Sequence, residues 1–173
     1  MPSPEDCEAW IRYDRRVYEA FLRRLRRLPW KSLIANRESG HHSIRNTLVH
    51  ILHVHEAWHQ FIVPGRVSEL SREGLQYDDF TGWPKLLDYE RQVFEGIERR
   101  TARLTPRELR RRVKAPWMPG IYTVADAYLQ SSIEQAHHLG EIIALLWQKD
   151  LAPPAMTWIE TMHRPRSRGR GRR

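Results

Sequence analysis

Residues 123–148, TVADAYLQSSIEQAHHLGEIIALLWQ, indicate the fold more clearly than any other stretch of the sequence. Apolar side chains recur there every three or four residues, which is the period of one face of an α-helix. The segment Thr123–Asp126 provides a cap-like start for that helix. Alternation typical of strands is nearly absent from the chain, and nothing repeats at a fixed period. The sequence therefore predicts an all-α protein.

Three further segments show helical periodicity, each beside a cap or a breaker. Pro29 ends the first, Ser43 caps the second, and Thr81 to Pro84 starts the third. We expect an antiparallel four-helix bundle over residues 1–162. Its expected elements are long helices over 4–28, 44–62, 84–104 and 124–148, a loop over 30–42, a short extra helix over 106–113, a turn over 116–120 and one more turn near 157–162.

The length of 173 residues suits one domain, and the charge is concentrated at one end. The formal net charge is +8, but six arginines and no acidic residue lie in 163–173, which leaves +2 for residues 1–162. We expect 163–173 to be a disordered tail with weak, non-specific attraction to nucleic acid. The arginines of the first helix are expected to form a solvated face; they are Arg15, Arg16, Arg23, Arg24, Arg26 and Arg27.

Location and redox chemistry follow from what the sequence lacks. The acidic start, residues 1–6, has no apolar core of a secretory signal, and no apolar run is long enough to span a bilayer. The single cysteine, Cys7, cannot form an internal disulfide, so a cytoplasmic location without membrane attachment is expected. A helix N-terminus would lower the pKa of Cys7, but no clear base lies near it in the sequence.

Histidines and a glutamate occupy faces that helical periodicity turns toward the core. Glu134 and His138 lie one turn apart on a stripe that is apolar at both ends, and His50 lies on an apolar stripe of the second helix. If these helices pack together, two imidazoles and a carboxylate meet and could hold a divalent cation with open coordination positions. Hydrogen bonding of each buried histidine to a neighbouring residue is the alternative.

The other histidines carry weaker signals. His53 falls toward the polar side of the second helix, whereas His55 lies beside apolar residues and is expected to reach the interior. His59 has no assigned role. His41 and His42 precede the helix in a loop-like segment and are left out of the predicted site.

Three segments, in order and spacing, resemble the DinB/YfiT-like family of metal-binding four-helix bundles, which includes the bacillithiol transferases. The segment 43–52 with Glu56 and Trp58 resembles the helix that carries the family's first metal histidine. Residues 104–109 with 122–124 resemble the approach to its last helix, and 137–146 with Pro153-Pro154 resemble its ending. The similarity covers most of residues 5–160.

The resemblance implies a metal-dependent enzyme that transfers a low-molecular-weight thiol, or a hydrolase, acting on a small-molecule substrate. His50 and His138 match two metal ligands of the family, and Glu134 stands where a third histidine is common. The ion would be Zn, Ni, Fe or Mn, and would lower the pKa of the thiol. Glu56, Glu141 and His137 would support the ligands; the sequence assigns no catalytic residue. A homodimer is also implied, with Trp83 and Trp117 as interface candidates or as ordinary loop packing.

Two other interpretations remain open at this point. Glu134 in place of the usual histidine is compatible with a metal-free bundle that serves as a binding scaffold. The arginine-rich tail is compatible with a non-specific nucleic-acid-binding protein, although no recognition module is present in the sequence.

Overall fold

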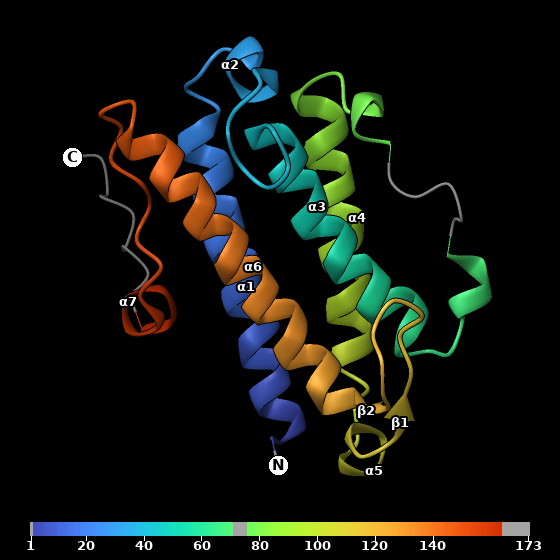
Figure 1. Ribbon diagram of the computed structural model, residues 1–173. Helices are drawn as coiled ribbons and strands as arrows, with labels where there is room; N and C mark the ends of the chain where they lie inside the picture. Colours follow the sequence, from blue (N-terminus) through green and yellow to red (C-terminus); the bar gives the residue numbers. More distant parts are fainter. Residues whose placement is uncertain (1, 71–75, 164–173) are drawn as a thin grey trace.

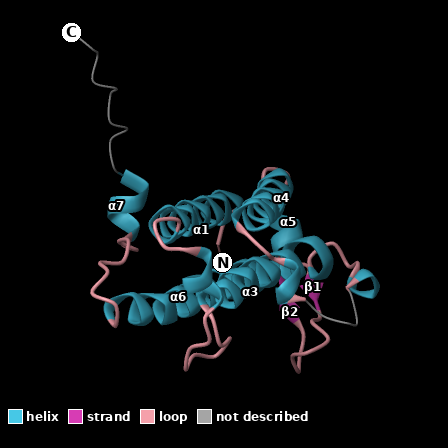
Figure 2. Ribbon diagram, turned by 90° about the horizontal axis from the view of Figure 1, so that it is seen from above, coloured by secondary structure: helices cyan, strands magenta, loops and turns pink. Residues whose placement is uncertain are grey.

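A computed structural model describes residues 2–70 and 76–163, and four long helices dominate it (Figure 1). They are α1 (Pro4–Leu25), α3 (Ile44–Glu56), α4 (Trp83–Thr101) and α6 (Val124–Trp147). A π-helix, η1 (Ala57–Ile62), continues α3 without a break. Each long helix packs against two of the others in the order α1, α4, α3, α6, so that the four surround one core (Figure 2). The predicted all-α bundle is confirmed.

The helices do not simply alternate in direction along the chain. In Figure 1, α1 and α6 run upward from the end where the N-terminus lies, whereas α3 and α4 both run downward. The neighbours α1 and α4 are therefore antiparallel, as are α3 and α6, while α3 and α4 are parallel. This order places the antiparallel pair α3 and α6, which carries most of the histidines, along one side of the core.

Side-chain caps fix the helix starts where the sequence predicts them. Ser43 accepts a hydrogen bond from the backbone of Asn46 at the start of α3. Thr123 and Asp126 form a reciprocal capping box at α6, which satisfies two backbone N–H groups that the helix leaves unpaired. Thr105 caps the short helix α5 (Pro106–Leu109). These caps explain why the predicted starts of these helices are accurate.

The connections differ more from the prediction than the helices do. The first helix ends at Leu25 rather than Leu28, and the expected loop after it contains α2 (Trp30–Ile34). The turn at 116–120 brings its flanks together as two antiparallel strands, with Arg112 opposite Thr123. The remaining short elements are η2 (Val67–Glu69), η3 (Tyr77–Asp79), β1 (Arg112–Val113), β2 (Tyr122–Thr123) and α7 (Trp158–His163). Residues 164–173 of the expected tail lie outside the described residues.

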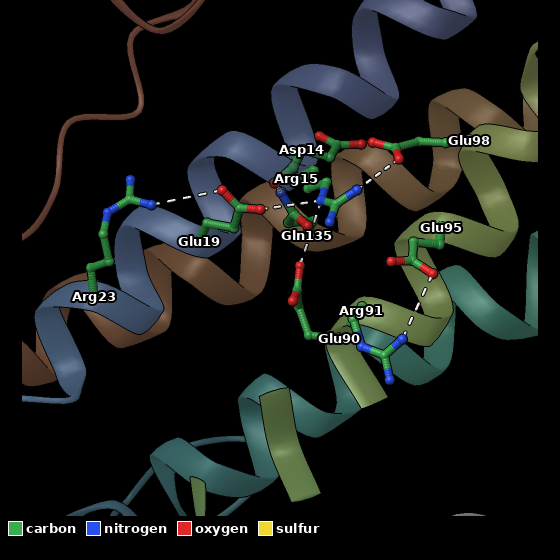
Figure 3. Close-up of polar contacts among 9 residues, drawn as sticks. All are labelled: Asp14, Arg15, Glu19, Arg23, Glu90, Arg91, Glu95, Glu98 and Gln135. Atoms are coloured by element: carbon green, nitrogen blue, oxygen red, sulfur yellow. Dashed lines mark hydrogen bonds and ion pairs between the residues drawn. The ribbon is translucent and has the colours of Figure 1, made fainter. Parts of the chain in front are cut away.

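Arg15 departs from the expected solvated cationic face of α1. Its guanidinium lies 3.1 Å from Glu19, 2.7 Å from Glu98 and 3.8 Å from Glu90, so it links α1 to α4 (Figure 3). Arg16 also has a tertiary contact, because it donates a hydrogen bond to the backbone carbonyl of Thr161. Helical periodicity identified the face of these arginines but not the acidic residues that α4 presents to it.

Among the described residues, no helix combines the length and the apolar character that crossing a lipid bilayer would require.

Candidate metal centre

Three imidazoles meet where α3, α6 and the loop before α3 come together. His50 comes from α3, His138 from α6, and His41 from the loop. The ring centroids are 3.9 Å apart for His41 and His50, 4.6 Å for His50 and His138, and 4.9 Å for His41 and His138. One nitrogen of each ring lies within 4.8 Å of the others, close enough for a single ion to contact all three.

Backbone contacts hold His41 over the start of α3. The side chain of Asn46 donates a hydrogen bond to the His41 carbonyl, and the backbone N–H of Arg37 donates to the His42 carbonyl. His42 has a φ of 62°, which turns the chain sharply into the helix cap. A Cβ on Gly40 would lie 3.2 Å from Glu141 Oε1, so the glycine allows the loop to approach α6 closely.

The surroundings of His41 and His50 favour their neutral imidazoles. Burial lowers the pKa of His50 to about 3, and the neighbouring His41 and His138 act in the same direction. Burial, followed by His138, also lowers the pKa of His41. Among the described residues, no side chain forms a hydrogen bond with the His50 ring. A neutral imidazole has a free lone pair, and this is the form that binds a metal ion.

Carboxylates flank His138 at both ring nitrogens. Glu141 Oε2 lies 3.2 Å from Nδ1, and Glu134 Oε2 lies 3.4 Å from Nε2. A neutral imidazole has only one N–H, so only one of these contacts can be a hydrogen bond. If the ring is neutral, the other contact places a nitrogen lone pair beside a carboxylate oxygen, and either a shared cation or a second proton on the ring would relieve this. The residues therefore fit a divalent ion, with the Glu141 contact resembling a carboxylate that orients a metal-binding histidine.

The predicted site residues fall into different positions. His50 and His138 lie together with His41. Glu134 contacts His138 but does not belong to this group of three histidines. His137 is exposed, with Nε2 3.9 Å from Glu141, and it forms a second candidate group with His138 and Glu141. Glu56 accepts a hydrogen bond from the Tyr89 hydroxyl at 2.7 Å and belongs to neither group.

His41 is the residue that the sequence analysis missed. It lies nine residues before His50 in a loop, where helical periodicity gives no information about direction. The only local signal is the run Gly40-His41-His42 directly before the Ser43 cap. The hydroxyl of Tyr77 lies 3.4 Å from His41 Nδ1, a contact from a segment that the sequence analysis did not link to the site.

A second pair of histidines lies deeper in the same helix interface. His55 and His59 are fully buried; His55 Nε2 donates to Gln135 Oε1 at 3.0 Å, and His59 Nε2 lies 2.9 Å from Ser131 Oγ. Ser131 itself donates to the Tyr128 carbonyl, so His59 is the donor in that contact. Burial lowers the pKa of His55 to about 4 and that of His59 well below its usual range. The predicted inward position of His55 is confirmed.

Cys7 is unsuited to nucleophilic chemistry. Its side chain is fully buried, and burial raises the pKa of the thiol to about 12. The lowering expected from the start of a helix is therefore wrong, because desolvation of the thiolate outweighs the helix dipole.

Comparison with known proteins supports one family. No curated protein matches the chain. The family model of the DinB superfamily matches residues 13–142, a span that begins within α1, extends into α6 and includes all three converging histidines. Because that match covers more than half of the chain, the protein belongs to the DinB superfamily.

Proposed function

We propose that the protein is a metal-dependent enzyme that transfers a low-molecular-weight thiol to a small electrophile. The observation that carries the proposal is the convergence of His41, His50 and His138. Burial lowers the pKa of His41 and of His50, and within the described part of the chain no side chain hydrogen-bonds to the His50 ring. Membership of the DinB superfamily supports the same conclusion. Three imidazole donors suit Zn, Ni or Fe, while a neighbouring carboxylate also admits Mn.

The proposed ligands are His50 and His138, with His41 and Glu134 as the candidates for further positions. A bound divalent cation would supply a Lewis acid that lowers the pKa of a thiol, or of water in a hydrolase. Glu141 holds the His138 ring through Nδ1, which leaves Nε2 directed toward Glu134. Where His41, His50 and His138 hold the ion, the partly exposed Glu134 stays available to accept the proton that the thiol loses.

The transfer reaction is balanced without an external oxidant or reductant. The thiol sulfur forms a bond to the electrophilic carbon, the bond from that carbon to its leaving group breaks, and the thiol proton passes to Glu134 and then to solvent. No side chain other than Glu134 is required to change its protonation state. Cys7 takes no part, because its thiol is buried.

Metal content of the untagged full-length protein is the first test. We expect about one metal ion per chain by mass spectrometry, and loss of that ion in both His50→Ala and His138→Ala. His163→Ala is the matched control, because His163 is an exposed histidine on α7. Absence of bound metal, with no uptake of added Zn, Ni or Mn, would show instead a metal-free binding scaffold.

His41→Ala and Glu134→Gln then separate the two candidates for the third ligand. Loss of metal in the first variant alone identifies a three-histidine set, whereas loss in the second alone identifies two histidines and one carboxylate. For activity, the loaded protein is incubated with 2-mercaptoethanol and an alkyl halide. Halide release that requires both the metal and the thiol supports thiol transfer, and release that needs the metal but no thiol supports a hydrolase.

The proposal includes a homodimer and a cytoplasmic location. The outer face of α6 supports the dimer, because Leu129, Ile133 and Trp147 are exposed to 46%, 53% and 64%. Light scattering on the eluting protein is the test: a dimer that Ile133→Glu converts to a monomer supports this face. Of the interface candidates named from sequence, Trp83 packs against Trp30 with ring centroids 5.4 Å apart.

A further inference from the structure

A cavity of about 410 Å³ adjoins the histidine cluster, with His50 and Glu134 among its lining residues. Its volume lies within the range of cavities that bind small molecules. Along α3 and η1 the lining runs from His50 through His53 and Val54 to Ala57 and Trp58, so it becomes apolar beyond His53. Gln130 of α6 and the turn residues Trp117 and Met118 complete it. The cavity therefore has a polar end at the candidate metal centre and an apolar body.

The apolar wall is assembled from separate parts of the chain. Val54 lies on α3, Ala57 and Trp58 on the π-helix η1, and Trp117 in the turn between the two strands. The rings of Trp58 and Trp117 meet edge to face with centroids 5.9 Å apart. Trp58 is buried, but Trp117 remains 53% exposed, so a large aromatic surface stays open to solvent beside the cavity.

The charge of the lining excludes some ligands. No lysine or arginine lines this cavity among the described residues, and its carboxylate is Glu134. The side-chain amide of Gln130 donates a hydrogen bond to Glu134 at 2.8 Å, so that N–H group does not face a ligand in the cavity. In the metal-free protein, an organic anion would meet the Glu134 carboxylate with no lysine or arginine on the described part of the wall, whereas an uncharged molecule would not be repelled.

We infer that this cavity binds the electrophile of the reaction, that the electrophile has an aromatic or branched apolar body, and that the metal-free cavity prefers uncharged ligands. The apolar body would lie between Trp58 and Trp117, and the reactive carbon would lie toward His50 and Glu134. Trp117 determines specificity, because it is the exposed half of the aromatic pair. The assignment of the occupant as electrophile rests on the proposed function; the binding preference rests on the cavity alone.

A fluorescence titration of the full-length, metal-free protein with N-phenyl-1-naphthylamine tests that preference. This probe is neutral and aromatic, and we expect it to bind with a stoichiometry of one per chain. Trp117→Ala should weaken binding at least tenfold, and Trp117→Phe should retain most of it. Trp158→Ala is the matched control, because Trp158 is an exposed tryptophan on α7 and does not line the cavity.

The anionic probe 8-anilinonaphthalene-1-sulfonate tests the charge argument. It should bind at least tenfold more weakly than the neutral probe, and Glu134→Gln should narrow that difference. Equal binding of the neutral probe by wild type and Trp117→Ala, or tighter binding of the anionic probe by wild type, would overturn the inference. Because these titrations need no metal, their failure is distinct from failure of the metal-content test.

Discussion

Two groups of histidines lie along the same interface between α3 and α6, yet their surroundings differ. His55 and His59 are fully buried, and each donates to one side chain of α6. His41, His50 and His138 lie nearer the surface and face one another, beside a cavity. In the first group, the ring N–H groups donate to side chains of α6 and so hold the helices together. In the second group, the three imidazole rings face one another.

This contrast shows that the hydrogen-bond partner of the ring, rather than burial alone, distinguishes a structural histidine from a candidate metal ligand. Burial lowers the pKa of His50 and of His55, so both favour the neutral form. His55 has the amide oxygen of Gln135 as an acceptor, and Gln135 is itself anchored because it donates to the backbone carbonyl of Asp14. His50 faces other imidazoles, and these become compatible neighbours when a cation lies between them.

Asp14→Asn gives the largest expected change in stability. The backbone carbonyl of Asp14 accepts a hydrogen bond from Gln135, which in turn contacts His55 of the buried histidine pair. Burial raises the pKa of Asp14 to about 7, against the hydrogen bond from Ser132, so ionisation at pH 8 opposes folding. The difference of about three pKa units corresponds to about 4 kcal/mol. We expect the variant to gain up to about that free energy of unfolding at pH 8, measured in urea with metal-free protein. A gain that persists unchanged at pH 4 would contradict the ionisation argument.

In the same variant, the loss of stability that the buried histidines cause on acidification should become visible. The folded pKa of His55, about 4, lies below its ordinary value of 6.5, so stability is lost as pH falls between these values. Asp14 opposes this in the wild type, because its raised pKa makes folding more favourable as pH falls from about 7. From His55 alone, metal-free Asp14→Asn should lose about 3 kcal/mol between pH 6.5 and pH 4, and the lowered pKa values of His59 and His50 add to that loss. The free energy of unfolding of the wild type should change less over this range. A steeper loss in the wild type would refute the raised pKa of Asp14.

His55→Ala should separate the two groups directly. Loss of the ring leaves a cavity and removes the partner of Gln135, which we expect to cost about 2 kcal/mol because the half-satisfied imidazole is removed at the same time. Metal content should be unchanged. His50→Ala is the comparison, with loss of metal and a smaller change in the stability of metal-free protein. Loss of metal in His55→Ala without unfolding would show that the groups act as one.

Glu141→Gln gives the smallest expected effect and sharpens the role of the carboxylate beside His138. An amide can still contact Nδ1 but holds the ring less firmly than a carboxylate does. We expect about a tenfold loss of metal affinity with the site otherwise intact, since such supporting groups typically have effects of this size. Competition with a chromophoric chelator measures it. An unchanged affinity would mean that Glu141 does not support the metal site and serves only as the neighbour of Gly40 and His137.

Local signals in the sequence predicted the helices well because each signal acts over a few residues. Ser43 and Thr123 cap the helices that they were expected to cap, and the apolar stripes of α3 and α6 face the core. Those stripes also brought His50 and His138 to one interface. The position of His41 depends on how a loop folds back onto two helices, and no periodic pattern in the sequence records that.

The polar contacts in the core were harder to foresee for a related reason. Asp14 lies among the positively charged residues of α1, and nothing local indicates that Ser132 of α6 will donate to it. The same applies to Gln135 and His55, which are 80 residues apart in the chain. Such pairs depend on how each helix is rotated about its axis. Apolar periodicity identifies the face that turns toward the core but not which polar side chains on that face meet.

The π-helix η1 sets the direction of the side chains that follow α3, where His59 and part of the cavity wall lie. Its wide turn is marked by the hydrogen bond from the Val63 N–H to the Trp58 carbonyl, which spans five residues instead of four. One residue fewer in this segment would permit an ordinary α-helix and would swing the side chains beyond the deletion by about 100° around the axis. Deletion of Ala57 would therefore shift the phase of Trp58 and His59 together, which couples the packing of the core to the shape of the cavity.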